Sequence, residues 1–501
     1  MARRHGLRPG LDACRHRHDR GRVTGGPMRV STPFQRTSDR HLERFILSAV
    51  ATLIVAATAT QSGAVEPPRP HVVIVMIDAL RPDHLGAWGK PELRTPHLDR
   101  VAEQGVFFRN IFAPMPSSAP SRATILTGRA PHTHGVRING RNLPLAELTL
   151  TELLADNGYT TVSTGRLQRQ FDQGFEHVNI GGGELADSLA GVMWDSLKYG
   201  DAEDGHVSTD VAPDVRAAIK WMATHGHDEA PTFLWLDMTH NLHEAWRPPP
   251  PYDTMFDADY TGRDVSVNPM YSPDLTEREV QHAHALYDGQ ASFVDSQFGW
   301  FTKALTELGL SERTILVVVS DHGTYLGEHD LWQKCPVMFD PVMRSTLIVR
   351  QNGVVPAGVQ IENLAQLSDV FATILDLAGR PVPDRAAGSS HSLRSTWESK
   401  TSVRPAVFME FCQYKGTASK AIRSEDWLYV YFESVGEIPW GEISPADVLR
   451  AKGWPRRLLF DVKADPDLTV NLVDRHPEVE RQLRIQLLDW LIASENDLDS
   501  R

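Results

Sequence analysis

The chain has 501 residues, 41% of them hydrophobic and 23% charged, which is typical of a globular protein and too long for one simple domain. Its 36 glycines and 33 prolines are too few for a collagen-like or low-complexity chain. With 51 Lys and Arg against 64 Asp and Glu, the net charge is −13, which argues against a nucleic-acid partner because such proteins need a basic surface. An anionic substrate is still compatible with this charge, since an acidic protein can contain a cationic pocket.

The first part of the chain is predicted to be an export leader, residues 1–66. Residues 45–57 are strongly apolar, Arg40 and Arg44 precede them and small residues follow, which is the pattern of a secretory signal peptide. This run is shorter than the ~20 apolar residues that span a bilayer, so we expect a periplasmic or secreted protein rather than a membrane-anchored one. Met28 is an alternative start of translation.

The cysteines provide little covalent stabilisation. Cys14 lies in the leader, which leaves Cys335 and Cys412 and therefore at most one disulfide in the mature chain. We expect the fold to depend on its apolar core.

Three apolar runs predict strands that are buried on both faces of a sheet. Residues 71–77, 232–236 and 314–319 are apolar almost throughout and lack the alternation of a half-exposed strand. Amphipathic stretches separate these runs, and the clearest, residues 276–308, begins with a Thr-x-x-Glu capping box. This alternation predicts an α/β fold with a large, mixed and mostly parallel sheet sandwiched by helices.

The pattern changes after Val403. Short strand-like runs and one helical stretch follow, at residues 406–409, 427–432, 457–461 and 477–492. They predict a smaller antiparallel sheet with one helix. Because the stretch 380–390 contains Pro and Gly, we expect a larger domain over residues 67–385 and a C-terminal α+β subdomain over residues 386–501.

Ionisable residues follow two of the predicted parallel strands. Asp78 comes directly after the first strand, and Asp321 and His322 come just after the third. Ligands of parallel α/β sheets bind beyond the carboxyl ends of the strands. These side chains are therefore candidates for a binding site.

A second candidate is the start of a predicted helix at Ser118. Pro120 suits the first turn of this helix and Gly128 suits its end. Free N–H groups and the helix dipole favour negative charge at such a start, and Arg122 returns to the same helix face as Ser118. Taken alone, Ser118 is also compatible with an ordinary helix N-cap.

These motifs resemble those of the type I sulfatases. The segment Ser118-x-Pro-Ser-Arg-x-x-x-Leu-Thr-Gly-Arg129 is similar to the family's signature, whose first residue is Cys or Ser and is converted to formylglycine. Other motifs agree in the same order, at residues 80–86, 95–99, 320–323, 326–329, 331–334, 459–461, 464–467 and 471–472. The resemblance covers most of the mature chain, looks closest to iduronate-2-sulfatase-like members, and implies the alkaline-phosphatase-like fold.

The resemblance also implies the roles of several residues. Ser118 would become the formylglycine whose hydrate attacks sulfur, and together with Asp78, Asp321 and His322 it would hold a divalent cation, usually calcium in this family. Carboxylate oxygens suit a hard cation, while the histidine nitrogen keeps manganese and magnesium open.

Three further residues are implied to act on the substrate. Arg122 and Lys334 would bind the sulfate group, because their charges match oxygens that become more negative as the ester bond breaks. His243 stands where the family has a histidine that contacts the substrate and protonates the leaving alkoxide.

The chain departs from the family pattern at three positions. Ala79 replaces the second acid that many members have after the first strand, and Gln168 replaces a histidine that is assigned to deprotonating the hydrate. Arg166 stands in place of a lysine in the same segment, and its planar guanidinium is not equivalent to an ammonium. We expect a histidine from elsewhere in the chain to replace the one lost at Gln168.

The resulting prediction is an exported sulfuric ester hydrolase that acts on sulfated carbohydrate and depends on a separate formylglycine-generating maturation enzyme. Two alternatives stay open. The single acid at Asp78 and the substitution at Gln168 would allow a phosphonate monoester or phosphodiester hydrolase on the same scaffold. Loss of turnover would instead leave a catalytically silent anion-binding protein. The sequence makes no prediction of oligomeric state.

Overall fold

The computed structural model describes residues 69–165, 171–180, 212–238, 242, 245–266, 275–334, 337–413, 417–435 and 445–499. The chain divides into two units, Met1–Pro67 and Pro68–Arg501, and everything described below belongs to the second. The predicted leader lies outside the described residues, as do Arg166, Gln168, His243 and Cys335. Among the described helices, none has the length and apolar character needed to cross a membrane.

A nine-stranded sheet forms the centre of this unit, in the order β10-β2-β9-β6-β1-β5-β3-β4 with β11 beside β2. Its strands are β1 (His71–Ile77), β2 (Val106–Phe112), β3 (Thr160–Thr164), β4 (His177–Ile180), β5 (Thr232–Met238), β6 (Thr314–Val319), β9 (Arg344–Arg350), β10 (Val359–Ile361) and β11 (Ala365–Gln366). Strand β9 runs antiparallel to β2 and β6, whereas the other pairs are parallel. The predicted mixed, mostly parallel sheet is confirmed.

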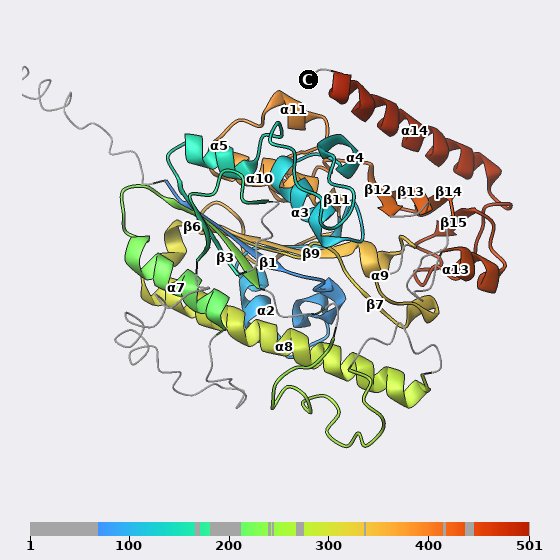
Figure 1. Cartoon of the computed structure of the whole chain (residues 1–501), viewed down its shortest axis with the longest axis horizontal. Helices are drawn as coiled ribbons and strands as arrows, with labels where there is room; N and C mark the ends of the chain where they lie inside the picture. The colour runs from blue at the N-terminus through green and yellow to red at the C-terminus, as the bar shows by residue number, and fades with distance from the viewer. Residues whose placement is uncertain are drawn as a thin grey trace, which may run out of the picture. The chain divides into compact units, whose positions relative to one another are not determined.

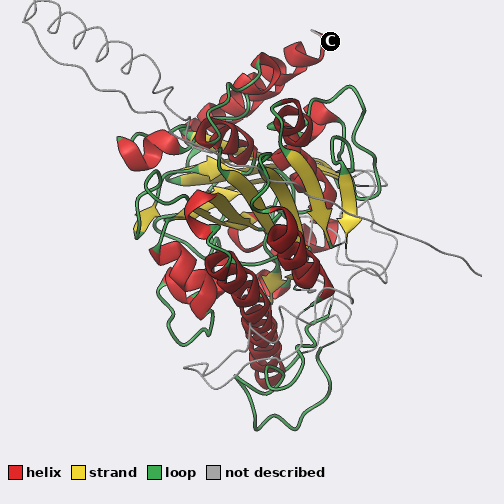
Figure 2. Ribbon diagram, turned by 90° about the vertical axis from the view of Figure 1, so that its left-hand side faces the viewer, coloured by secondary structure: helices red, strands yellow, loops and turns green. Residues whose placement is uncertain are grey.

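Helices cover both faces of this sheet (Figures 1 and 2). One face carries α3 (Ser118–Thr127), α5 (Leu150–Asp156) and α10 (Ser368–Leu377), and the other carries α2 (Pro96–Glu103), α7 (Pro213–His225) and α8 (Glu277–Glu307). Alternate residues of β1 enter two apolar cores, one on each face of the sheet. Burial on both faces explains why the sequence of this strand is apolar without alternation.

The predicted helix at residues 276–308 is confirmed as α8. Thr276 is its N-cap, and the capping box with Glu279 is present. Shorter elements connect the main ones: η1 (Pro82–His84), η2 (Gly86–Trp88), α4 (Pro131–His134), η6 (Ser311–Arg313), β7 (Tyr325–Leu326), η7 (Glu328–Asp330), β8 (Trp332–Gln333), α9 (Asp340–Met343), α11 (Asp384–Ala387) and α12 (Arg394–Glu398).

The C-terminal part contains the expected antiparallel sheet and terminal helix. Its elements are β12 (Ala406–Gln413), β13 (Thr417–Ser424), β14 (Trp427–Ser434), α13 (Pro445–Lys452), β15 (Arg457–Asp461) and α14 (Pro477–Asp499). Sequence reasoning missed β13, because its sequence is rich in polar residues and two of its buried side chains are Lys420 and Arg423. Apolar residues of this sheet belong to the same core as β1 and α3. The domain boundary near residue 385 stays a prediction.

Candidate active site

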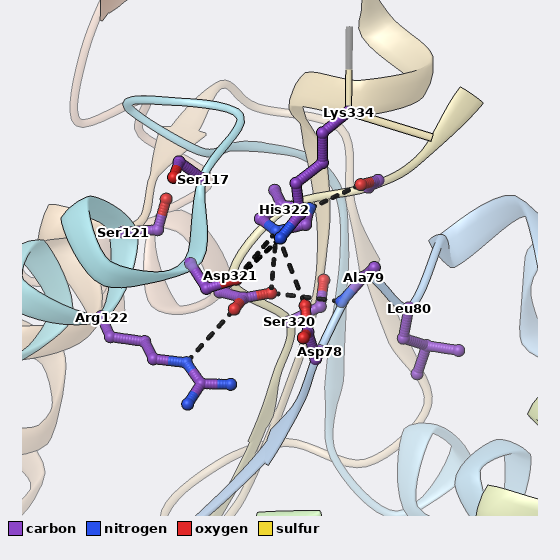
Figure 3. A network of polar contacts seen from close by, with 12 residues as sticks. Asp78, Ala79, Leu80, Ser117, Ser121, Arg122, Ser320, Asp321, His322 and Lys334 are labelled. Carbon is purple, nitrogen blue, oxygen red and sulfur yellow. Dashed lines mark hydrogen bonds and ion pairs between the residues drawn. The ribbon is translucent and has the colours of Figure 1, made fainter. Parts of the chain in front are cut away.

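Three neighbouring parallel strands bring ionisable side chains to one edge of the central sheet. Strands β6, β1 and β5 are adjacent, and Met76 of β1 pairs with Val319 on one side and Asp237 on the other. Each strand therefore ends at a similar level. Asp78, Asp321 and His322 lie just beyond these ends, with one ligand atom of each residue within 4.8 Å of the others (Figure 3).

Ser118 is the first residue of α3 and faces this cluster. Its hydroxyl accepts a hydrogen bond from Lys334 Nζ at 3.0 Å and lies 3.3 Å from His322 Nε2. The N-cap of α3 is Ser117, and Gly128 ends the helix with a left-handed φ of 69°. The interpretation of Ser118 as an ordinary N-cap is therefore wrong, and its hydroxyl is directed into the site.

The hydrogen bonds of His322 fix which ring nitrogen faces Ser118. Nδ1 lies 2.6 Å from the carbonyl oxygen of Gly323, which can only accept, so Nδ1 carries the proton. Burial lowers the pKa of His322, and the Lys334 ammonium lowers it further. The ring is therefore neutral near pH 7, and the lone pair of Nε2 points toward the cluster.

The residues present fit a bound divalent cation. His322 Nε2 lies 3.5 Å from an oxygen of Asp78 and 3.7 Å from an oxygen of Asp321. Lone pairs of a neutral imidazole and two carboxylates repel one another unless a cation lies between them. Two carboxylates and one imidazole suit calcium, magnesium or manganese.

Arg122 is held between two buried carboxylates. Its Nε donates to Asp321 Oδ2 at 3.2 Å, and its Nη1 donates to Asp237 Oδ2 at 2.6 Å. Burial alone would lower the pKa of Arg122, but the carboxylates raise it above its ordinary value. Burial raises the pKa of Asp237 to about 6, despite the opposing effect of Arg122.

Sequence reasoning missed Asp237. The signal was present, because this residue follows the apolar run 232–236 near the same sheet edge as Asp78. Asn139 was also missed: its Oδ1 accepts hydrogen bonds from Ser117 Oγ at 2.8 Å and from the backbone N–H of Ala119 at 3.0 Å. These bonds hold the residues on both sides of Ser118. Nothing in the sequence separates Asn139 from other polar loop residues.

Lys334 reaches the site from the hairpin β7–β8, far from Ser118 in sequence. The preceding residue, Gln333, has a left-handed φ of 56°, which is uncommon for a residue with a side chain. Figure 3 shows Lys334 directed toward His322, opposite Asp78.

Most of the predicted site residues come together in space. The structure gathers Asp78, Ser118, Arg122, Asp321, His322 and Lys334. Arg166 and His243 lie outside the described residues, so their predicted roles stay predictions. Cys412 is a free cysteine.

The site combines a hydroxyl group at a helix start, cationic side chains and a cluster of metal-ligand type at the carboxyl edge of an α/β sheet. This combination defines a hydrolase of anionic esters. A sequence model of the Sulfatase family matches residues 70–380, and a model described as N-sulphoglucosamine sulphohydrolase, C-terminal, matches residues 327–438. The first match covers well over half of the chain. This protein therefore belongs to the sulfatase family and is an enzyme of that class.

Relatives support this assignment. The chain is 26% identical over 386 residues to an ulvan-active sulfatase of Formosa agariphila, and the match covers 73% of each chain. It is 25% identical over 526 residues to an N-acetylglucosamine-6-O-sulfatase of Bacteroides thetaiotaomicron, covering 89% of this chain and 90% of the relative. The iduronate 2-sulfatase of Mus musculus is 26% identical over 398 residues, and the match covers 63% of this chain and 70% of the relative.

Solved structures show the same fold. A protein in complex with its substrate D-glucosamine-2-N,6-O-disulfate superposes with a TM-score of 0.65 at 20% identity, covering 85% of this chain and 98% of the other. The phosphonate monoester hydrolase of Agrobacterium radiobacter superposes with a TM-score of 0.64 at 22% identity, and the match covers 85% of this chain and 96% of the other. The expected alkaline-phosphatase-like fold is confirmed.

Proposed function

We propose that this protein hydrolyses sulfate monoesters of carbohydrates. The observation that carries the proposal is the position of the Ser118 hydroxyl, in contact with Lys334 and 3.3 Å from His322 at the head of the acidic cluster. The names of the relatives, which include sulfatases of ulvan and of N-acetylglucosamine, support carbohydrate as the substrate class.

The nucleophile is Ser118 after its oxidation to formylglycine by a separate maturation enzyme. The hydrated aldehyde has two hydroxyl groups. One attacks sulfur and displaces the sugar oxygen, and loss of a proton from the other then releases sulfate and restores the aldehyde. An unmodified serine would instead form a sulfate ester without a neighbouring hydroxyl to expel it, and this ester would hydrolyse slowly.

The surrounding side chains stabilise the charge that moves during this reaction. Lys334 donates to the attacking oxygen, and Arg122 offers N–H groups to sulfate oxygens that become more negative as the ester bond breaks. His243 and Arg166 complete the site in this proposal, with His243 protonating the leaving sugar oxygen. The base that replaces the histidine absent at Gln168 stays a prediction.

Asp78, Asp321 and His322 would hold a divalent cation, with calcium the first candidate. When bound, such a cation polarises the sulfate oxygens and the nucleophile.

The test is mass spectrometry of the peptide that contains Ser118, on protein purified from its native host, together with turnover of an aryl sulfate and of sulfated sugars. We expect a peptide that lacks two hydrogen atoms and hydrolysis of the sulfate esters, and we expect neither with Ser118→Ala. An unmodified peptide in protein that turns over sulfate esters would disprove the formylglycine step. A modified protein that turns over no sulfate ester would disprove the function.

A second candidate is hydrolysis of phosphonate monoesters or phosphodiesters. It is favoured by Ala79, which leaves one acid after β1, and by the fold shared with a phosphonate monoester hydrolase. A competition assay between an aryl sulfate and an aryl phosphodiester separates the two candidates, because the preferred ester inhibits turnover of the other.

We also propose that residues 1–66 direct export, so the mature enzyme is periplasmic or secreted. The apolar run after Arg44 supports this. N-terminal sequencing of the exported protein tests it, and a mature protein that keeps residues 45–57 would contradict it.

A further inference from the structure

Asp237 is a buried carboxylate that the proposed chemistry does not use. It lies in β5, directly beside β1, and its side chain is inaccessible to solvent. Its backbone is closely packed, since a Cβ atom on Gly165 would meet the carbonyl oxygen of Asp237 at 2.1 Å. Because its side chain is inaccessible, Asp237 places a negative charge directly beside Arg122, where water cannot screen it.

The carboxylate fixes the orientation of Arg122. Two edges of the guanidinium are engaged, Nε with Asp321 and Nη1 with Asp237, while Nη2 takes part in neither ion pair. Because the guanidinium is planar and rigid, two such contacts define its plane. Asp237 thus fixes the orientation of the Arg122 guanidinium and also neutralises part of its positive charge.

This offset changes the charge balance of the site. Asp78, Asp237 and Asp321 contribute three negative charges, and Arg122 and Lys334 contribute two positive ones. A divalent cation at the cluster would leave one net positive charge among these described groups. Without Asp237 the balance would be two positive charges.

A site that carries one positive charge fewer favours a sulfate monoester, which carries one negative charge, over a phosphate monoester, which carries two. The desolvation cost of an anion grows faster with its charge than the attraction from a fixed site does. A site with less positive charge therefore discriminates against the dianion.

We propose that Asp237 is a specificity-determining residue, which positions Arg122 and lowers the positive charge of the site so that tetrahedral monoanions are preferred over dianions. This inference rests on the proposed function for its biological meaning, since it explains how a sulfatase excludes phosphate monoesters. Its physical content concerns anion binding and can be measured without turnover.

The experiment compares two anions of the same shape, methanesulfonate with one negative charge and methylphosphonate with two. Their dissociation constants are measured by calorimetry at about pH 9, where methylphosphonate carries two negative charges and Asp237 is charged, on the full mature protein in calcium. We expect Asp237→Asn, which keeps the shape and an oxygen acceptor, to improve the affinity for methylphosphonate relative to methanesulfonate about tenfold.

Two further variants separate charge from structure. Asp237→Glu keeps the charge and is expected to keep the wild-type preference. Asp369→Asn is the matched control, because Asp369 is also fully buried and pairs with a buried arginine, Arg404, but lies outside the site. We expect it to change stability without changing the ratio of the two affinities, whereas an equal change in both Asp→Asn variants would overturn the proposal.

An unchanged ratio in folded Asp237→Asn would also overturn it. If that variant does not fold, the affinities of the wild-type protein test the proposal. The wild type must bind methanesulfonate at least as tightly as methylphosphonate, and a clear preference for methylphosphonate refutes the proposal. A protein that cleaves no sulfate ester but shows these binding ratios would refute the proposed function and leave the role of Asp237 standing.

Discussion

At the scale of single residues, Ala79 adopts a conformation that is uncommon for a residue with a Cβ. Its φ is 58°, and its side chain is fully buried. This conformation directs its N–H to Asp321 Oδ1 at 3.1 Å. The Tyr287 hydroxyl donates to the Ala79 carbonyl and accepts from the N–H of Arg81, both at 2.9 Å. Hydrogen bonds therefore hold both the N–H and the carbonyl of Ala79 in place, as expected where backbone strain is kept at a functional site.

The conformation of Ala79 predicts opposite effects for two substitutions. Ala79→Gly removes a left-handed penalty of roughly 1–2 kcal/mol, partly offset by the entropy of glycine in the unfolded chain, so we expect unchanged or slightly higher stability. Ala79→Val adds a β-branched side chain to a fully buried left-handed position, and we expect a loss of more than about 2 kcal/mol. Urea unfolding measures both free energies. Equal destabilisation by the two substitutions would contradict the role assigned to backbone strain.

Residues whose position follows from topology could be predicted from the sequence. Asp78, Asp321 and His322 each follow an apolar strand, and parallel strands bring such ends together. Asn139 could not be predicted, because its loop approaches α3 only in the folded chain. The contribution of Asp237 depends on a distance to Arg122 that the sequence does not contain.

At the scale of elements, Glu410 connects the C-terminal sheet to α4, the short helix that follows α3. It is fully buried in β12, and it accepts from the backbone N–H of His132 at 2.7 Å and from Lys420 of β13. His132 in turn contacts Ser494 Oγ of α14 at 2.6 Å. Burial would raise the pKa of Glu410, but His132 and Lys420 hold it below its ordinary value. One ionised carboxylate thus joins β12, β13 and α4, and His132 extends the network to α14.

Removal of this carboxylate is expected to destabilise the whole unit. Glu410→Ala leaves Lys420 buried without its partner, which predicts a loss of about 3–5 kcal/mol, and Glu410→Gln should lose less because it keeps an acceptor. Thermal and urea unfolding give the values. The control is Glu425→Gln, which removes an exposed partner of Lys463 and should change nothing measurable. If Glu410→Ala had no more effect than this control, the network would not stabilise the fold.

Elements with a strong periodicity or an apolar run were predictable, and those stabilised by tertiary ion pairs were not. Strands β1 and β6 match the predicted bounds, and α8 differs by one residue at each end because its capping box defines its start. Strand β13 was missed since its buried Lys420 is compatible with a strand only when Glu410 faces it. The sequence of β13 alone gives no sign of this partner.

At the scale of the whole molecule, buried neutral histidines connect stability to pH. His71 accepts from the N–H of Thr232 with Nδ1 at 3.0 Å, so Nε2 carries the proton and donates to the Gly226 carbonyl at 2.9 Å. Protonation of Nδ1 would break the first of these bonds. Burial accordingly lowers the pKa of His71 to about 4, and burial also lowers the pKa of His134 to about 3.

These shifts predict that the protein loses stability in acid. Because the folded pKa of each histidine lies below the value near 6.5 of the unfolded chain, the unfolded state binds protons first as the pH falls below about 6.5. The free energy of unfolding should fall by up to about 1.4 kcal/mol per pH unit for each such histidine, which for His71 alone amounts to roughly 3 kcal/mol by pH 4. Urea unfolding between pH 8 and about pH 4 measures this slope.

His71→Gln separates this histidine from the other acid-sensitive groups. A glutamine can accept from the Thr232 N–H and donate to the Gly226 carbonyl without titrating, so it keeps both bonds at every pH. Near neutral pH we expect His71→Gln to have the free energy of unfolding of the wild type, apart from any strain that the new side chain introduces. Between pH 6.5 and 4 its free energy of unfolding should fall less steeply than that of the wild type. His476→Gln, at a partly exposed position just before α14, should leave the slope of the wild type unchanged. A slope that His71→Gln does not reduce would mean that acid destabilises the protein through other groups, such as His134, whose Nδ1 accepts from the N–H of Val136 at 3.1 Å.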